Sequence, residues 1–133
     1  MAIDLTQIAN AVARLEEAVE RYRSDSADTV VRDGLVQRFE FTYDTATKAL
    51  RRALESAADS PGEIDRLTFP ALIRTAWEQG LVEAGWPAWK FYRDMRNITS
   101  HTYDEDQARK VVAAIPDFLK EVQTVVRLLQ QRA

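Results

Sequence analysis

Apolar residues recur at helical spacing along most of the chain, and no segment alternates as a strand would. Because 3.6 residues make one turn, steps of three and four place side chains on one face of a helix. The first such stripe predicts a helix that ends near Arg23: Leu5, Ile8, Val12, Leu15, Val19 and Tyr22. After a polar stretch at 24–28, a longer stripe predicts a second helix over about 29–58: Leu35, Phe39, Thr42, Ala46, Ala49, Leu50, Ala53 and Ala57.

Proline, glycine and capping residues predict the limits of a third helix. Ser60-Pro61-Gly62 ends the second helix and forms a connector, because proline lacks a backbone donor and glycine readily adopts turn conformations. Thr68 is the expected N-cap of the third helix, which closes by Gly85. Its apolar positions are Leu72, Ile73, Ala76, Trp77 and Leu81.

Two more helices are expected in the C-terminal half. Pro87 can begin a fourth helix that runs to about Ser100, with one face formed by Ala88, Phe91, Tyr92, Met95, Ile98 and Thr99. Asp104 is the natural cap of a fifth helix, which Pro116 should bend. Its apolar face is formed by Ala108, Val111, Val112, Ile115, Leu119, Val122, Val126 and Leu129. The pattern predicts an all-α, up-and-down bundle of about five helices, in a single domain over 1–133.

Charge and composition exclude several classes of protein. The 18 basic and 21 acidic residues give a net charge of −3, which argues against a broad, non-specific DNA binder. The absence of cysteine excludes disulfides, thiolate zinc sites and cysteine nucleophiles. The N-terminal sequence MAIDL lacks the features of a signal peptide, and no apolar run approaches the ~20 residues that span a bilayer. We therefore expect a cytoplasmic protein without a membrane association.

The candidate chemistry lies between residues 86 and 103, which hold five of the chain's aromatic residues and its only histidine, His101. In the simplest interpretation the aromatic side chains belong to the hydrophobic core, and His101 hydrogen-bonds to backbone groups at the end of a helix. Its neighbours favour a site instead, because Arg96 and Tyr103 add a guanidinium and a phenol. On a regular helix Arg96 and His101 would lie about 140° apart. They converge only if the helix ends near residue 100, or if two chains bring their copies together.

Arg96, His101 and Tyr103 match the motif R-x4-H-x-Y position by position. In this motif the chain resembles the HEPN superfamily of small helical domains, which carry R-x4-6-H, and in particular its HepT-like toxins. It also resembles the family of nucleotidyltransferase substrate-binding proteins, through residues 36–43 (VQRFEFTY) and 97–105 (NITSHTYDE). The resemblance extends from about residue 5 to residue 129. One departure is Thr47, where the family has an aromatic residue just before Lys48.

The resemblance implies a metal-independent endoribonuclease toxin that works as a dimer, with the motif lining a shared cleft. It also implies a partner, a minimal nucleotidyltransferase that silences the toxin by transferring adenylate to the motif tyrosine, here Tyr103. RNA cleavage needs a base, an acid and a cation. His101 can serve either proton role, with a reference pKa of about 6.5, and Arg96 can bind two phosphate oxygens. Because there is only one histidine, we expect a composite site across a two-fold axis, with no metal and no cofactor.

Several residues near the motif have two interpretations. Tyr103 could instead pack on Tyr92 or hydrogen-bond across the bundle. Asn97, Ser100 and Arg93 are candidate contacts for RNA or a nucleotide, and Arg51-Arg52 could widen a basic groove, although paired surface charges are more often solvated. The acidic run 104–106 fits the positive N-terminal end of the fifth helix better than it fits a metal site.

Two other functions remain open at this point. The first is a non-catalytic helical subunit that binds a substrate or nucleotide for the nucleotidyltransferase and uses residues 96–103 as a recognition surface. The second is a helical adaptor without an active site, because the net negative charge does nothing to attract RNA.

Overall fold

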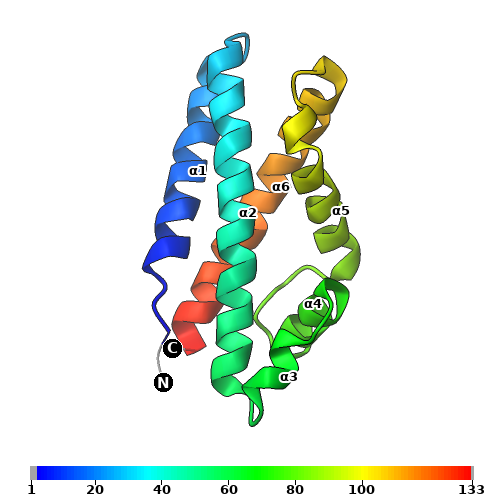
Figure 1. The fold of residues 1–133 in the computed structure, drawn as a ribbon. Helices are drawn as coiled ribbons and strands as arrows, with labels where there is room; N and C mark the ends of the chain where they lie inside the picture. Colours follow the sequence, from blue (N-terminus) through cyan, green and yellow to red (C-terminus); the bar gives the residue numbers. More distant parts are fainter. Residues whose placement is uncertain (1–2, 133) are drawn as a thin grey trace.

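The computed structural model describes residues 3–132. Outside that range lie Ala133 and the first two residues of the sequence MAIDL, all three of which belong to the predicted domain. It confirms an all-α fold, and residues 3–132 contain no strand (Figure 1). Six α-helices and one 3-10 turn follow in the order α1 (Thr6–Ser24), α2 (Thr29–Ala57), α3 (Pro61–Asp65), α4 (Phe69–Glu78), α5 (Trp86–Asn97), η1 (Thr99–His101) and α6 (Glu105–Arg132).

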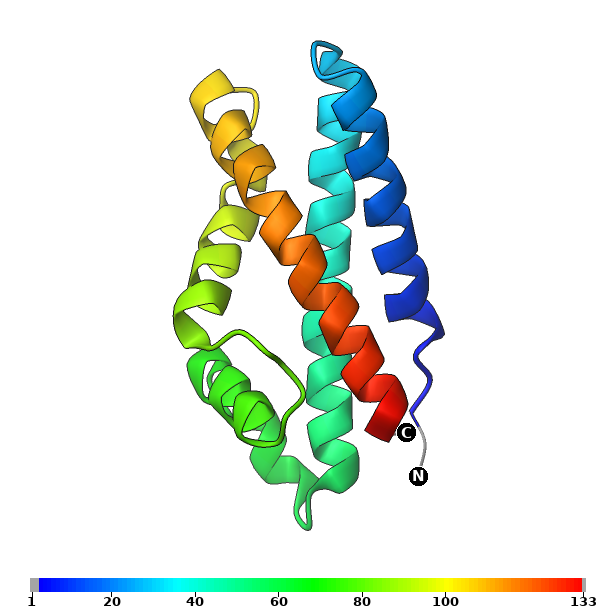
Figure 2. The ribbon, with the colours of Figure 1, turned by 180° about the vertical axis from the view of Figure 1, so that it is seen from behind.

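The three long helices form the frame of the bundle. Helices α1 and α2 lie side by side, and α6 crosses α2 obliquely, as Figures 1 and 2 show from opposite sides. Helices α3 and α4 lie near the C-terminal end of α2, and α5 leads from there toward its N-terminal end. The link between α5 and α6, which carries the motif, therefore lies at the end of the bundle opposite α3 and α4.

An aromatic cluster forms the centre of the core beneath α5. Trp89 is fully buried and packs edge-on against Tyr92 and Phe118, with ring centroids 5.7 and 6.2 Å away. The indole N–H of Trp89 donates to the buried Glu121 at 2.8 Å, and the backbone N–H of Ala84 donates to the same carboxylate oxygen at 3.0 Å. Helix α5 and the chain before it are thus attached to α6 by both packing and hydrogen bonds.

The predicted helix starts are confirmed by their caps. The Thr68 hydroxyl accepts from the backbone N–H of Ala71 at 3.3 Å, and the Asp104 carboxylate accepts from that of Asp106 at 2.8 Å. These contacts satisfy backbone donors that have no partner within the helix. Pro116 lies inside α6, which continues without interruption on both sides of it, and the predicted bend stays a prediction. Within residues 3–132, no helix is both long and apolar enough to span a membrane.

The structure corrects three details of the predicted bundle. The expected connector after Ser60 contains the short helix α3, which has too few residues to show a periodicity. The fourth predicted helix ends at Asn97, earlier than Ser100, and the 3-10 turn η1 follows it. Trp77 and Phe91, expected on buried faces, are 57% and 47% exposed, because the short helices α4 and α5 each bury only a narrow side.

Candidate functional site

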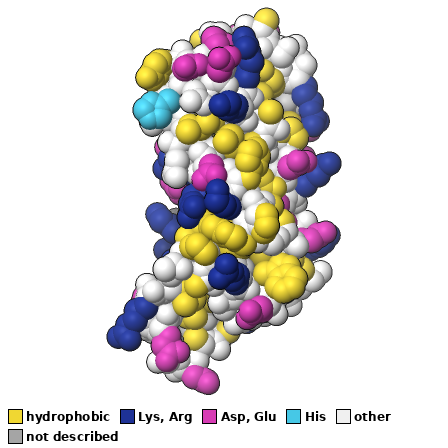
Figure 3. All heavy atoms as spheres, turned by 90° about the vertical axis from the view of Figure 1, so that its right-hand side faces the viewer, with side chains coloured by type: hydrophobic (Ala, Val, Ile, Leu, Met, Phe, Trp, Pro, Cys, Tyr) yellow, Lys and Arg dark blue, Asp and Glu magenta, His cyan; other side chains and the backbone are white. Residues whose placement is uncertain are grey.

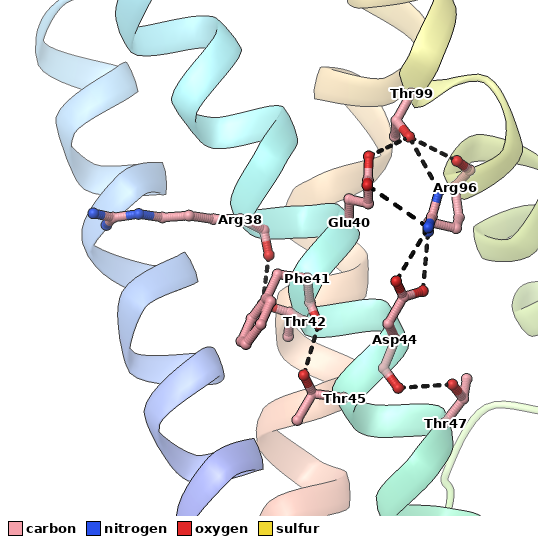
Figure 4. Close-up of polar contacts among 9 residues, drawn as sticks. All are labelled: Arg38, Glu40, Phe41, Thr42, Asp44, Thr45, Thr47, Arg96 and Thr99. Atoms are coloured by element: carbon pink, nitrogen blue, oxygen red, sulfur yellow. Dashed lines mark hydrogen bonds and ion pairs between the residues drawn. The ribbon is translucent and has the colours of Figure 1, made fainter.

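Arg96, in the last turn of α5, is bound by two carboxylates of α2 (Figure 4). Its Nε and Nη2 atoms donate to the two oxygens of Asp44 at 3.0 and 3.1 Å, which is a bidentate ion pair. Nη2 also lies 3.7 Å from Glu40 Oε1. Paired hydrogen bonds of this kind fix both the position and the plane of the guanidinium. Arg96 is therefore held in one orientation by residues of its own chain.

Thr99 connects this ion pair to the start of η1. Its buried hydroxyl lies 2.7 Å from Glu40 Oε2 and 2.8 Å from the carbonyl oxygen of Arg96, so it can donate to either acceptor. The same hydroxyl oxygen accepts from Arg96 Nη1 at 3.4 Å. The two carboxylates, the guanidinium and the hydroxyl form one network, which we call the Arg96 network: Glu40, Asp44, Arg96 and Thr99. It anchors the end of α5 to α2.

The Arg96 network holds the guanidinium in its charged form. The hydrogen bond to Asp44 raises the pKa of Arg96, partial burial opposes that shift, and the charges of Asp44 and Glu40 add to it. The Arg96 side chain is 29% exposed. Nε and Nη2 face Asp44, and Nη1 already donates one of its two hydrogens to Thr99, so the second hydrogen of Nη1 is the donor left for an external anion. The guanidinium is thus partly exposed and partly engaged by residues of its own chain.

His101, the last residue of η1, is exposed and differs from Arg96 in having no polar partner for its side chain. Its backbone N–H donates to the Ile98 carbonyl at 2.9 Å, and its own carbonyl accepts from the N–H of Asp104 at 3.1 Å. Within residues 3–132 its imidazole makes no hydrogen bond or ion pair, and its ring lies beside that of Tyr103, at a centroid distance of 6.2 Å and an angle of 69°. Figure 3 shows the histidine at the surface. It is therefore free to engage another molecule.

Tyr103 is also at the surface, where it is 84% exposed. The interpretation that it packs on Tyr92 is wrong, since Tyr92 lies in the core and contacts Trp89, Phe91 and Phe118 instead. The interpretation that the imidazole of His101 satisfies backbone groups is wrong as well, because the hydrogen bonds of the turn are made by its backbone. Both side chains extend from the same exposed turn.

The end of α5 at Asn97 does not by itself bring the two motif residues into contact. Within residues 3–132 no hydrogen bond, ion pair or ring contact joins Arg96 to His101. Of the residues proposed to assist them, Asn97 and Ser100 are exposed beside the motif. Arg93 packs over the rings of Trp86 and Phe69 instead, with its guanidinium carbon 5.1 and 6.0 Å from their centroids.

Arg51 and the acidic run have structural partners, whereas Arg52 is exposed. Arg51 donates to the carbonyl of Ile64 at 2.8 Å and so holds α3 against α2. In the acidic run, Asp104 caps α6, Glu105 binds Arg32 at 2.8 Å, and Asp106 lies 3.3 Å from Arg109. Within residues 3–132 no three His, Asp or Glu side chains are placed to hold a metal ion together.

Glu40 and Asp44 are the site residues that the sequence did not reveal. They lie more than 50 positions before Arg96 in the chain, so no local motif links them to it, although Glu40 lies within the run 36–43. A signal was present in principle, because the two acids are four residues apart and must share one face of α2. Their relation to Arg96 depends on how α2 and α5 pack, which helical periodicity does not specify.

Comparisons with known proteins agree over nearly the whole chain. Residues 3–131 match the model of a family described as nucleotidyltransferase substrate binding protein like. A protein of Haemophilus influenzae named probable ribonuclease HepT is 36% identical, over 98% of this chain and 94% of that protein. A solved structure from Haemophilus influenzae, titled as revealing the fold of a substrate binding domain of a nucleotidyltransferase, has a TM-score of 0.88 and 34% identity. The match covers 96% of this chain and 99% of that one.

Proposed function

The chain belongs to the family of nucleotidyltransferase substrate binding protein like proteins, and on this premise we propose that it is a metal-independent endoribonuclease whose catalytic residues are Arg96 and His101. The observation that carries the proposal is the contrast within the motif: a guanidinium fixed by α2 lies at the same helix end as an imidazole with no polar partner. The similarity to a protein named probable ribonuclease HepT supports the same activity.

The two residues divide the chemistry of RNA cleavage between them. The 2′-hydroxyl attacks the adjacent phosphorus, its proton goes to a base, and the departing 5′-oxygen receives a proton from an acid. The imidazole of His101 can take or give that proton. The remaining hydrogen of Arg96 Nη1 can donate to a phosphate oxygen, on which negative charge develops, and the charge of the guanidinium stabilises it further. Because Asp44 already orients the guanidinium, it needs little rearrangement when RNA binds.

We propose that the working site is shared by two copies of this chain. One imidazole cannot easily be acid and base in the same step, and each chain has one histidine. The exposed position of His101 and Tyr103 on one turn allows two copies to face each other across a two-fold axis. If this is so, specific activity should fall when the protein is diluted below the dissociation constant of the dimer. Activity that is independent of concentration for a protein shown to be monomeric would contradict a shared site.

The activity is tested with labelled RNA in buffer that contains EDTA. Replacement of His101 with alanine should reduce the cleavage rate by about 10² to 10⁴-fold, the usual contribution of a general acid or base. The melting temperature should not change, because the imidazole makes no hydrogen bond or ion pair within residues 3–132. Lys110→Ala, which alters an exposed side chain on α6 outside the motif, is the control. A His101→Ala variant that cuts RNA at the wild-type rate would disprove the assignment.

We further propose that this ribonuclease is the toxin of a toxin–antitoxin pair and that its antitoxin is a minimal nucleotidyltransferase that adenylylates Tyr103. The exposed phenol can reach the active site of another protein. Its oxygen would attack the α-phosphorus of ATP, the bond to the β,γ-diphosphate would break, and the phenolic proton would pass to a base of the partner. The attached phosphate would place a negative charge near His101 and Arg96 and compete with RNA.

Intact-mass measurement after incubation with the partner and ATP tests this modification. Wild-type protein should gain the mass of one adenylate, and Tyr103→Phe should gain none. Tyr92→Phe is the matched control, because its phenol is buried and should not affect the result. No mass gain on wild type, or an equal gain on Tyr103→Phe, would exclude modification at this residue.

A second function is favoured by the carboxylates around Arg96. Asp44 and Glu40 occupy much of the guanidinium, which suits a structural ion pair, and the solved relative is titled as a substrate binding domain of a nucleotidyltransferase. In this alternative the chain is a non-catalytic subunit that presents residues 96–103 to a substrate or nucleotide. It predicts no RNA cleavage by the isolated chain and no arrest of growth when the chain is expressed alone.

A further inference from the structure

A groove between α1 and α2 lies apart from the Arg96 network and contains none of its four residues. It encloses a cavity of about 540 Å³, which is in the range of ligand sites. On α1 it is lined by Gln7, Asn10 and Arg14, at steps of three and four residues. On α2, Gln37, Phe41, Thr45 and Lys48 recur at similar steps. Helical periodicity therefore places two stripes of side chains, mostly polar in type but including Phe41, opposite each other along the groove, which we call the α1–α2 groove.

Phe41 gives the α1–α2 groove an apolar surface that the fold does not use. Its side chain is 61% exposed, whereas Phe39, two residues earlier on the same helix, is fully buried. Figure 4 shows Phe41 and Thr45 on a different side of α2 from Glu40 and Asp44, which point toward Arg96. An exposed ring beside amide side chains can stack a flat group while the amides hydrogen-bond to its edge.

The charge of the α1–α2 groove is opposite to that of the whole chain. Its lining includes Arg14, Arg38 and Lys48, and none of its lining residues within 3–132 is acidic, although the protein carries a net charge of −3. Arg14 and Arg38 share one nearby carboxylate, that of Glu17, at 3.0 and 3.6 Å. Lys48 has no ion pair in the described chain. The cations are therefore only partly compensated, which favours an anionic ligand.

From these features we infer that the α1–α2 groove binds a single-stranded segment of the RNA substrate, with one base stacked on Phe41 and backbone phosphates bound by Lys48 and the two arginines. An aromatic ring flanked by cations is the combination that binds single strands with little sequence preference. Helix α2 would then carry the strand on its α1 side and fix Arg96 on its α5 side. The ligand's identity rests on the proposed ribonuclease function, but binding is measurable without cleavage.

The experiment measures fluorescence anisotropy of a labelled, single-stranded 12-nucleotide RNA, with His101→Ala in every variant so that the RNA stays intact. Phe41→Ala should weaken binding about tenfold, because it removes one stacked base. Lys48→Gln should reduce the slope of log K against log salt by about 0.7, the value for one lost phosphate contact on a single strand. Glu17→Gln should strengthen binding, because it releases Arg14 and Arg38 for the phosphates.

Matched controls change similar side chains outside the groove. Trp77→Ala removes another exposed aromatic, on α4, and Lys110→Ala removes another exposed cation, on α6. Neither should alter RNA affinity by more than twofold. Circular dichroism of Phe41→Ala should match that of the parent, since the ring is mostly in solvent.

Four results would overturn the inference. The first is that Phe41→Ala and Lys48→Gln both bind RNA with the affinity and salt dependence of the parent. The second is that Glu17→Gln does not increase the affinity for RNA. The third is ATP binding as tightly as the 12-mer, which would assign the groove to a free nucleotide. The fourth is a change of oligomeric state in Phe41→Ala by light scattering, which would make the groove a contact between copies. Failure of the ribonuclease proposal gives a different pattern, in which the wild-type chain binds RNA and does not cut it.

Discussion

The two halves of the segment 86–103 have opposite environments. In the first half Trp89 is fully buried and Tyr92 is 6% exposed, and both pack against α6. In the second half His101 is exposed and Tyr103 is 84% exposed, on a turn that the Arg96 network joins to α2. One aromatic-rich stretch thus anchors a helix with its first part and exposes the side chains of His101 and Tyr103 with its second. We therefore expect substitutions in the first half to affect stability and substitutions in the second half to affect the proposed activity.

The largest expected effect is on stability, in the first half. Trp89→Ala should reduce the free energy of unfolding by about 3–5 kcal/mol, because it leaves a cavity in the aromatic cluster and removes a donor from the buried Glu121. Urea denaturation followed by circular dichroism measures this. The matched variant in the second half, Tyr103→Phe, should lie within about 0.5 kcal/mol of wild type. Equal losses in the two variants would remove the distinction between the halves.

Arg96, where the halves meet, should affect activity more than stability. Arg96→Ala removes the cation proposed to stabilise the transition state and should lower the cleavage rate by about 10² to 10³-fold, as loss of a single such donor does. The stability change should stay near 1 kcal/mol, because the ion pair is partly open to solvent. Cleavage assays and urea melts on the same preparation give both values. A rate within twofold of wild type would favour the non-catalytic alternative.

Asp44 tests whether orientation of Arg96 matters in addition to its presence. Asp44→Ala leaves the guanidinium with Glu40 and Thr99 alone, and we expect about a tenfold lower cleavage rate, with partial recovery in Asp44→Glu. Asp94→Ala is the control, because Asp94 pairs with Lys90 on the exposed part of α5. The same loss in Asp94→Ala would mean that general charge, and not the bidentate pair, sets the rate.

The smallest expected effect appears only in alkali and belongs to the buried half. Burial raises the pKa of Tyr92 to about 12, and the nearby charges of Glu121 and Asp117 contribute. The same phenol in the unfolded chain ionises near pH 10, so the stability that it contributes is complete below pH 10 and is lost as the pH rises toward 12. Between pH 9 and pH 11, ionisation of this phenol should lower the free energy of unfolding of the wild type by about 1 kcal/mol. Tyr92→Phe should not show that part of the loss.

Chemical denaturation at pH 9 and pH 11 measures this difference. Burial also raises the pKa of Tyr43 to about 12, so the variant should keep part of the alkaline loss. An identical loss in wild type and Tyr92→Phe would show that the Tyr92 phenol does not contribute to it.

Local chemistry in the sequence predicted most of the fold. Thr68 and Asp104 each cap a helix through contacts with the next two or three residues, so their effect can be read without tertiary structure. The same holds for the apolar stripes of α1, α2 and α6, which face the core over many turns. Periodicity does not determine burial on a short helix: Trp77 lies in an apolar pattern and is still mostly exposed.

The candidate site was predictable only in part. The motif named Arg96, His101 and Tyr103, but it does not specify that Asp44 holds the arginine, since that contact joins residues 52 positions apart. Nor does it indicate the α1–α2 groove, whose lining alternates with core residues along two helices. Such features depend on the rotation of one helix against another. A short motif contains no information about that rotation.

The surface position of Tyr103 has a consequence for when the protein can be regulated. A phenol that is 84% exposed is accessible while every helix remains packed, so the modification proposed above would not require the bundle to open. If Tyr103 is modified as proposed, the modification can therefore take place at any time in the lifetime of the folded molecule and need not coincide with its synthesis.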